Sequence, residues 1–390
     1  MKEVNSILSE YGTTIFTIMS ALAVKHKAIN LGQGFPDGDG PADILDEAML
    51  ATKNESNQYP PMMGIPELRQ ASAAHSKTFY DIDVDWETQT IVTSGATEAI
   101  AACIFGLIEP GDEVVLIEPL YDCYLPIIRR AGAIPRLVRI APPNWELPCQ
   151  ELEAAFSEKT KLILFNTPTN PAAKVYTISE LEYIAGLVKK YDTYAICDEV
   201  YEHLVYDGRQ HIPLMTLPDM AERCIRISSA GKTFSMTGWK VGYSIGAKKL
   251  IDAASKAHQF LTFTTPPNLQ KAVAYGLKKD IAYFKDLGVD MQVKRDRMSR
   301  GLTKIGFEIL DSQGTYFLAA DYKPLGFDWG DVDFCKNLTI DAGVAAVPFS
   351  AFYQDGKDSG VNHFIRFCYC KRDEIIDMAL DRLDKYFSSN

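Results

Sequence analysis

The sequence predicts an α/β protein, in which a large domain with a mostly parallel sheet covered by helices is joined to a smaller α/β domain. Three observations support this fold class. From Gln89 onward, short apolar strands alternate with helices, as is typical of a parallel sheet covered on both faces. The chain has 390 residues, enough for about two or three domains. A long helix rich in lysine and arginine is predicted at 281–305, and the pattern of strands and helices changes after it.

Residues 1–45 are predicted to form an N-terminal arm that contributes to the small domain. A weak helical pattern covers 11–24, and the glycines and prolines of 28–41 indicate a loop. That loop is either a simple connector or a source of backbone N–H groups, at Gly34 for instance, for a carboxylate. Two helices separated by a loop come next, with the helices at 43–52 and 67–79 and the loop at 57–66.

Residues 46–280 are assigned to the large domain and 281–390 to the small one. Strands of the large domain are predicted at 90–93, 113–118, 135–140, 161–165, 194–197, 224–228 and 241–245. Its later helices are predicted at 98–108, 124–131, 151–156, 179–191 and 248–260. In the small domain we expect strands at 308–310, 315–319 and 364–369, and helices at 331–341 and 373–387.

The composition argues against several classes of partner and site. With 51 acidic and 40 basic residues the net charge is -11, so nucleic acid is not expected as a partner. No apolar run approaches the ~20 residues that span a bilayer, and the N-terminus lacks a signal-peptide core, so we expect a cytoplasmic protein without membrane contact. The eight cysteines include no C-x-x-C pair and the histidines no H-E-x-x-H; we expect buried free thiols and no metal site.

The stretch from Ser228 to Tyr243 carries two lysines, Lys232 and Lys240, among small and hydroxyl residues. Small residues let the backbone approach a ligand closely, and hydroxyl groups can donate to a phosphate. A lysine amine among apolar and cationic neighbours has a lowered pKa and becomes a nucleophile toward carbonyl groups. Taken alone, the stretch fits a solvated loop equally well.

Three other stretches lie where predicted strands end. Ser94-Gly-Ala-Thr97 leads from a strand into a helix, and helix N-termini hold phosphate readily. Asn166-Thr-Pro-Thr-Asn-Pro171 lies at the carboxyl end of a strand, where open α/β sheets bind ligands. Asp198 follows an apolar strand, where a carboxylate needs a cationic partner. That partner is either a protonated ring nitrogen or the cation of a structural salt bridge.

Together these stretches describe a ligand with a phosphate, an electrophilic carbonyl group and a ring nitrogen that needs an anion. Pyridoxal 5'-phosphate has these features, and proteins that bind it provide a lysine for a Schiff base and an acidic partner for the pyridinium nitrogen. We therefore expect this cofactor.

The order of the motifs resembles that of the fold-type-I, class I/II aminotransferases, and is most similar to the kynurenine aminotransferase, glutamine transaminase K and methionine aminotransferase group. The motifs are G-A-T-E-A, E-P-L-Y-D-C-Y, N-T-P-T-N-P, D-E-V-Y, S-A-G-K-T-F-S-M-T-G-W-K-V-G-Y and H-F-I-R-F-C-Y, and the resemblance runs from Leu31 to Arg366. It implies a seven-stranded type of sheet and transfer of an amino group from an L-amino acid to a 2-oxo acid. It also implies a homodimer with shared active sites.

The resemblance also implies roles for particular residues. Lys232 would hold the cofactor as a Schiff base and move a proton, Asp198 would hold the pyridinium nitrogen, and Tyr201 would donate to the phenolic oxygen. The other residues implied to bind the cofactor are Ala96, Thr97, Tyr121, Asn170, Ser229 and Lys240, with Tyr59 reaching in from the other subunit.

For the substrate, the resemblance implies that Arg366 binds the α-carboxylate as a bidentate fork, helped by the N–H of Gly34 and by Asn170. The residues implied around the donor's side chain are Ile15, Phe16, Tyr121 and Phe263. They include no second arginine, so we expect large apolar, sulfur-containing or aromatic amino acids, or glutamine, as donors. One departure from the family is Asn170-Pro-Ala-Ala-Lys174, where N-P-x-G-K is commoner.

Other functions stay open on the same scaffold. A C–S β-lyase and an N-succinyldiaminopimelate or other biosynthetic aminotransferase are alternatives, because fold does not decide among them. A regulator with an added DNA-binding domain is disfavoured, since residues 1–30 are too short for a helix-turn-helix domain and the chain is acidic. A binding or scaffold protein would have no need of Lys232.

Overall fold

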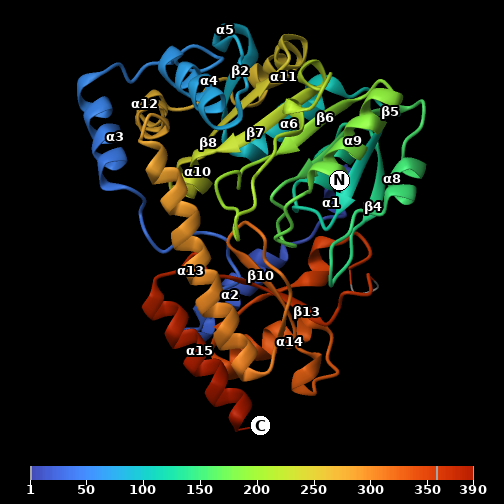
Figure 1. Ribbon diagram of the computed structural model, residues 1–390, viewed down its shortest axis with the longest axis vertical. Coiled ribbons are helices and arrows are strands. Elements are labelled where there is room, and N and C mark those ends of the chain that lie inside the picture. The colour runs from blue at the N-terminus through green and yellow to red at the C-terminus, as the bar shows by residue number, and fades with distance from the viewer. Residues whose placement is uncertain (1, 357–358, 390) are drawn as a thin grey trace.

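The computed structural model describes residues 2–356 and 359–389. A seven-stranded sheet and its helices form one part of the molecule, and a four-stranded sheet with the C-terminal helices forms the other (Figure 1). The long helix α13 (Ile281–Ile305) runs from the first part to the second. The predicted fold class, a mostly parallel sheet with a smaller α/β unit, is confirmed.

All the strands predicted for the large domain belong to the seven-stranded sheet. They are β2 (Thr90–Ser94), β3 (Glu113–Glu118), β4 (Ile134–Arg139), β5 (Thr160–Asn166), β6 (Tyr194–Asp198), β7 (Cys224–Ser229) and β8 (Val241–Gly246). Their order in the sheet is β2-β8-β7-β6-β5-β3-β4. Strand β8 runs antiparallel to both of its neighbours and the other pairs are parallel. The carboxyl ends of β5, β6 and β7 therefore meet at one edge.

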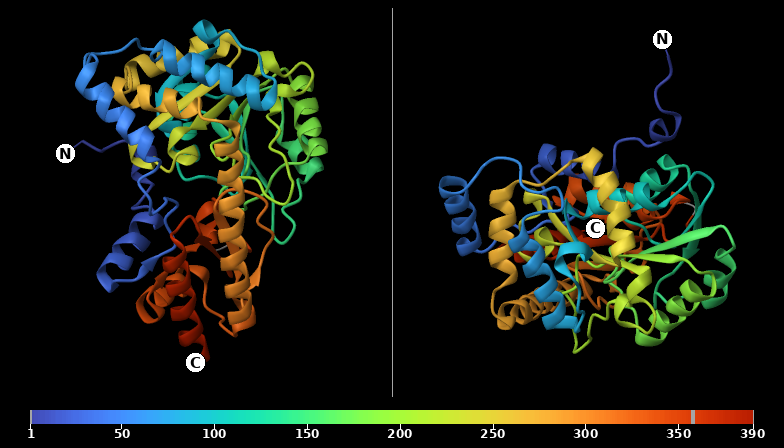
Figure 2. Two further views of the ribbon diagram at one scale, coloured as in Figure 1. Left: turned by 60° about the vertical axis from the view of Figure 1, so that its left-hand side comes forward. Right: turned by 90° about the horizontal axis from the view of Figure 1, so that it is seen from above.

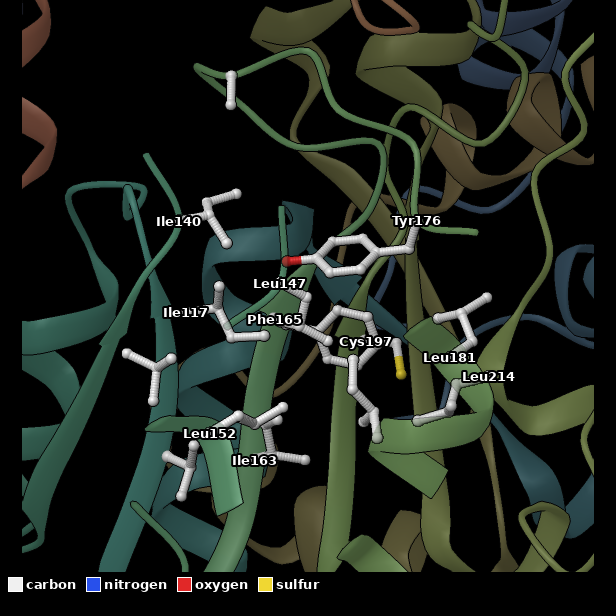
Figure 3. Packing of buried hydrophobic residues seen from close by; sticks show 14 of the residues in the cluster. Ile117, Ile140, Leu147, Leu152, Ile163, Phe165, Tyr176, Leu181, Cys197 and Leu214 are labelled. Atoms are coloured by element: carbon white, nitrogen blue, oxygen red, sulfur yellow. The ribbon is translucent and has the colours of Figure 1, made fainter. Parts of the chain in front are cut away.

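Helices cover both faces of this sheet, because each central strand is apolar on both sides. In β3, Val115 and Ile117 face one layer while Val114 and Leu116 face the other. Figure 3 shows the first layer, where side chains of β3, β5 and β6 pack against α8 and α9. The covering helices are α8 (Cys149–Ala155) and α9 (Ile178–Lys190) on that face, and α6 (Gly95–Leu107), α7 (Tyr124–Arg130) and α11 (Lys248–Leu261) on the other.

No element was predicted between 261 and 280, where the structure forms α12 (Pro267–Leu277). Pro267 occupies the first turn, where the missing N–H has no cost. The remaining early helices are α1 (Ser6–Ser9), α2 (Ile15–His26), α3 (Ala42–Asn54), α4 (Pro66–Tyr80), α5 (Trp86–Gln89) and α10 (Ala230–Thr233). Single turns of 3-10 helix lie at η1 (Leu214–Thr216), η2 (Ala221–Arg223), η3 (Thr237–Trp239), η4 (Lys323–Leu325) and η6 (Phe349–Phe352).

The smaller sheet is antiparallel, with the order β12-β13-β10-β9. Its strands are β9 (Glu308–Ile309), β10 (Phe317–Asp321), β12 (Val347–Pro348) and β13 (Phe364–Cys368). One face packs on α13, α14 (Asp331–Asn337) and α15 (Asp373–Ser388). The helix predicted at 331–341 is divided, because a π-helical turn, η5 (Leu338–Ala342), follows α14.

The N-terminal segment returns to this smaller unit. Strand β1 (Ile29–Asn30) pairs in parallel with β11 (Val344–Ala345), and Met19 and Leu31 belong to the same apolar cluster as β10 and β13. The N-terminal segment thus contacts the smaller unit, while the division into domains at residues 45 and 280 stays a prediction.

The cysteines are free thiols, and six of them are buried. Cys123 and Cys149 are half-buried. Within residues 2–356 and 359–389, no helix is both long and apolar enough to cross a membrane.

A buried ionic network ties α4 to strands β6 and β7. The Arg226 guanidinium donates to Glu199 Oε2 (2.8 Å), Glu202 Oε2 (2.7 Å) and Ser76 Oγ (2.8 Å). Both glutamates and the arginine are buried. Burial raises the pKa of Glu202, but the charge of Arg226 and smaller contributions of neighbouring groups together outweigh this effect and lower the pKa well below its usual range. Glu202 and Arg226 therefore form a charged pair at neutral pH.

Replacing Arg226 by methionine is expected to lower the free energy of unfolding by about 3–5 kcal/mol, because it leaves the buried Glu202 carboxylate without its ion-pair partner and Glu199 with His211 alone. Chemical denaturation monitored by circular dichroism measures the change. The control is Lys248→Ala, which breaks the exposed ion pair with Asp252 and should cost less than about 1 kcal/mol. Equal midpoints for the two variants would contradict the expectation.

Candidate active site

The cavity of interest has a volume of about 360 Å³ and lies between the carboxyl ends of the large sheet's strands and the smaller unit. It brings together most of the residues that the sequence singled out. Those lining it are Phe16, Gly34, Ala96, Thr97, Tyr121, Asn170, Asp198, Tyr201, Ser229, Lys232, Lys240 and Arg366. Segments separated by more than 300 residues in the sequence thus share one site.

Lys232 lies on α10, the single helical turn that follows β7. Its Nζ donates to the hydroxyl oxygen of Tyr316 (2.9 Å), which in turn donates to the carbonyl oxygen of Gly34 (2.7 Å). Burial of the amine lowers the pKa of Lys232. Lys232 is therefore held in place with a larger fraction of neutral amine, the form that attacks carbonyl groups.

Asp198 is the last residue of β6 and is buried. The Tyr124 hydroxyl donates to its Oδ2 (2.6 Å) and the Val200 N–H approaches its Oδ1 (3.4 Å). Burial raises the pKa of Asp198, an effect that these hydrogen bonds partly offset. Among the residues that the structure describes, no side chain forms an ion pair with it. A buried carboxylate of this kind fits a cationic ring nitrogen.

The N-terminus of α6 forms the anion-binding end of the cavity. Gly95 has φ of 75°, and a Cβ on it would lie 3.2 Å from the Nζ of Lys240. The backbone N–H groups of the first turn have no partner within the helix, and Ala96, Thr97, Ser229 and Lys240 line the same space. An ammonium group, hydroxyls and free N–H groups together suit a phosphate.

Arg366 lies in β13, at the interior of the smaller sheet, and is 1% exposed. Its Nη1 donates to Asn170 Oδ1 and its Nη2 to the carbonyl oxygen of Gly32, each at 2.7 Å. The guanidinium carbon lies 3.9 Å from the centre of the Phe317 ring. Burial lowers the pKa of Arg366. Its Nε has no hydrogen-bond partner, and no carboxylate of the described chain pairs with it, so the side chain can receive a carboxylate from a ligand.

Three of the predicted site residues lie outside the lining of this cavity. Tyr59 is 83% exposed and Phe263 is 40% exposed, and their rings meet edge to face at 5.5 Å. Ile15 is partly buried and packs against the apolar clusters of both parts of the molecule.

The structure adds contacts that the sequence did not predict. Tyr316 holds Lys232, Tyr124 holds Asp198, and Asn166 accepts the N–H of Asn170 through Oδ1 (2.6 Å). Tyr124 and Asn166 lie within motifs that were already placed at the site from the sequence, so their position in those motifs could have identified them. Tyr316 lies just before β10, far from every such motif, and no local pattern marks it.

The family described as aminotransferase class I and II matches residues 26–383. The chain is 45% identical over 386 residues to the probable N-succinyldiaminopimelate aminotransferase of Mycobacterium tuberculosis, covering 97% of each chain. It is 39% identical over 393 residues to human kynurenine–oxoglutarate transaminase 3, covering 94% of this chain and 87% of that protein.

The fold of this chain is also similar to that of a solved aminotransferase structure. The crystal structure of YbdL from Escherichia coli, for which a methionine aminotransferase function was identified, matches with a TM-score of 0.95 and 38% identity. The match covers 99% of this chain and 100% of that one.

Proposed function

Because this chain belongs to the class I and II aminotransferases, we propose that the cavity around Lys232 is the active site and that the donor carries no acidic side chain. The chain is an aminotransferase, and its amino donors are proposed to be L-amino acids with large apolar, sulfur-containing, aromatic or glutamine side chains. The acceptor is a 2-oxo acid.

The cofactor of this family is pyridoxal 5'-phosphate, and the residues of the cavity fit it. Lys232 offers a buried amine with lowered pKa, Asp198 a buried carboxylate without an ion-pair partner, and Lys240 an ammonium group beside the N-terminus of α6. When bound, the cofactor supplies an electrophilic carbonyl group and a ring that withdraws electrons.

The protein's own residues would divide the remaining tasks. Lys232 Nζ, released from Tyr316, would take the proton from the donor's Cα. Asp198 would hold a proton on the ring nitrogen through Oδ1 or Oδ2, with Tyr124 orienting the carboxylate. The Tyr201 hydroxyl would donate to the phenolic oxygen. Tyr121, Asn170 and Ser229 are assigned to the cofactor on their place in the cavity lining.

One observation carries the proposal about the donor: each cationic side chain in the cavity is already assigned to the cofactor or to the donor's α-carboxylate. Lys232, Lys240 and Arg366 are the lysines and arginines among the described residues that line it. Arg366 is assigned to the α-carboxylate, so none remains for a side-chain carboxylate. The space near Phe16 and Tyr121 instead includes Asp122, whose charge disfavours acidic donors.

Replacing Arg366 by lysine should raise KM for every donor by a similar factor, about 10- to 100-fold, because the charge stays while the bidentate fork is lost. A panel of amino donors measured by kcat/KM tests this. Phe16→Ala is the comparison variant, and it should change the ranking of methionine, glutamine and aromatic donors. A changed ranking with Arg366→Lys, and unchanged overall affinity, would reverse the two assignments.

A second candidate substrate is N-succinyldiaminopimelate. The observation in its favour is the 45% identity, over 97% of both chains, with the probable N-succinyldiaminopimelate aminotransferase. Its extra carboxylates would have to lie in the solvent-facing part of the cavity, since the described lining offers no further cation. Including this compound in the donor panel decides between the two substrate classes.

We also propose a homodimer with shared active sites, acting in the cytoplasm. Apolar side chains that a monomer would leave in water support an interface. Phe260 and Phe263 are exposed, and the ring of Phe263 contacts that of the exposed Tyr59. Val4 and Leu8 of the N-terminal segment are exposed as well. Figure 2 shows that segment standing out from the body of the molecule. A partner would cover these surfaces and place Tyr59 near the phosphate end of its own cavity.

Sedimentation equilibrium is expected to give twice the mass of the chain. Tyr59→Phe should weaken cofactor binding about 10- to 100-fold, because it removes one hydrogen bond to a charged phosphate. Equilibrium dialysis of the cofactor measures this change. The matched control is Tyr183→Phe, whose half-buried hydroxyl bonds the carbonyl oxygen of Cys149. A fully active monomer, or equal cofactor affinity in both variants, would contradict the shared site.

A further inference from the structure

Two thiols lie in contact beside the active site. The Sγ atoms of Cys368 and Cys370 are 3.1 Å apart, and both residues are buried. A disulfide bond needs a separation of about 2 Å, so a displacement of about 1 Å would allow the bond to form. The pair follows Arg366 directly in sequence, and its thiols affect the electrostatics of both Lys232 and Arg366.

A second cavity gives access to this pair. It has a volume of about 410 Å³ and is lined by Cys370, Gly38 and residues of α13. Asp286 and Asp290, two of its lining residues, are exposed on that helix. The cavity therefore opens to solvent, and a molecule as small as hydrogen peroxide can enter it beside Cys370.

The surroundings favour the thiolate form of one sulfur. Burial raises the pKa of Cys368, but the hydrogen bond from Cys370 and the charges of Lys371 and Arg366 outweigh it and lower this pKa to about 7. Burial raises the pKa of Cys370 well above its usual range. The pair thus combines a thiol that lines the cavity, Cys370, with a neighbouring thiolate, Cys368, that can take its proton and then attack the oxidised sulfur.

We propose that Cys368 and Cys370 form a redox-active dithiol that hydroperoxides oxidise to a disulfide. Cys370, the member of the pair that lines the cavity, attacks one oxygen of the peroxide as its proton passes to the Cys368 thiolate; the O–O bond breaks, and the other oxygen leaves as water after taking a proton. The Cys368 sulfur then attacks the resulting sulfenic acid of Cys370, and the hydroxyl group leaves as water with the Cys368 proton. Two thiols and one peroxide give one disulfide and two molecules of water.

Oxidation would act on the substrate-binding segment. The N–H of Cys368 donates to the carbonyl oxygen of Leu31 (2.7 Å), and the next residue, Gly32, accepts from Arg366. Lys371 donates to the carbonyl oxygen of Phe35 (2.8 Å) and pairs with Asp37 (3.1 Å). A displacement of Cys368 or Cys370 therefore moves the loop that orients Arg366. We expect the oxidised enzyme to bind its amino donor more weakly; this second effect rests on the proposed function.

A second pair of thiols in the same chain provides an internal control. Cys197 of β6 and Cys224 of β7 lie on neighbouring strands and share a hydrogen bond. Both have no exposed surface, and in the described part of the chain neither lines a cavity given above. The thiols are in contact in both pairs, so the pairs differ only in access from a cavity and in the charged groups nearby.

Peptide mass spectrometry of the wild-type holoenzyme tests the disulfide directly. Trypsin cleaves after Arg366 and after Lys371, so both cysteines fall in the peptide 367–371. After hydrogen peroxide treatment and alkylation under denaturing conditions, this peptide should carry no alkyl group and lack two hydrogen atoms. Cys197 and Cys224 should remain alkylated. Full alkylation of the 367–371 peptide, at peroxide levels that oxidise an exposed thiol, would overturn the proposal.

The effect on the substrate is measured separately. Peroxide should raise the KM of the preferred donor about tenfold, because small displacements in a site are costly, and dithiothreitol should restore it. Cys370→Ser should keep the basal KM and lose the reversible response, while Cys224→Ser should retain that response. A disulfide that forms without any change in KM would overturn the coupling to the loop. The mass measurement does not depend on turnover. Failure of the proposed function would therefore leave the test of the disulfide valid.

Discussion

Replacing Lys232 by alanine is expected to lower kcat at least about a thousandfold, because one residue supplies both the covalent attachment and the proton transfer. Lys232 is the buried amine held by Tyr316, and burial lowers its pKa. In the part of the chain that the structure describes, no other lysine except Lys240 lines the cavity. Lys240 lies at the phosphate end beside Gly95 and cannot take over both tasks.

Turnover with the preferred donor, with and without an added amine, measures the effect. An added amine should restore part of the activity of Lys232→Ala, since it can carry the proton. Borohydride should fix the cofactor to the wild type and not to the variant. The control is Lys249→Ala, which removes a surface lysine that bonds the Tyr194 hydroxyl. Near-native turnover of Lys232→Ala without added amine would show that the assignment is wrong.

Replacing Asp198 by asparagine is expected to slow deprotonation of the donor's Cα about 100- to 10,000-fold. Asparagine keeps the shape of the side chain and can still accept from Tyr124, but it carries no charge to hold a proton on a ring nitrogen. Without that proton the ring withdraws electrons poorly. Because the buried carboxylate has no ion-pair partner among the described residues, its removal should not lower the stability of the unloaded protein.

Single-turnover kinetics measure the Cα deprotonation, and thermal unfolding without cofactor measures the fold. Tyr124→Phe is the matched control: it removes the 2.6 Å hydrogen bond to Asp198 but leaves the charge, and should slow the reaction only about tenfold. Unchanged single-turnover rates in Asp198→Asn would contradict the assignment of Asp198. A large loss of stability would indicate a structural role.

The central sheet was predictable because its strands are buried on both faces and are read from the sequence as continuous apolar runs. Strands β3 and β5, for example, contain Val114 to Ile117 and Leu162 to Phe165, all buried. Helix α12 was missed because its boundary signal, two prolines, also suggests a loop. Short strands such as β1 and β11 were missed because two residues carry no periodicity, and only their pairing with each other defines them.

The loop 170–174 departs from the family's usual pattern at Ala173. The family more often has glycine there, and the backbone of Ala173 adopts φ of 55°, the left-handed conformation that glycine favours. The fold accepts alanine because its surroundings hold the loop: the Ala173 N–H donates to Thr169 (2.7 Å), and its carbonyl oxygen accepts from Gln313 and Gly314. Glycine is therefore preferred at this position but not required.

The sequence by itself determined the part of the site that lies at the carboxyl ends of the large sheet. Asn166 and Asp198 end the strands β5 and β6, Lys232 lies on the helical turn after β7, and parallel strands bring their carboxyl ends to one edge. Only the tertiary structure showed which contacts complete the site from elsewhere in the chain. Tyr316 meets Lys232 across 84 positions and Arg366 meets Asn170 across 196. Such contacts depend on how two separately packed sheets rest against each other, and no local pattern of apolar residues specifies that arrangement.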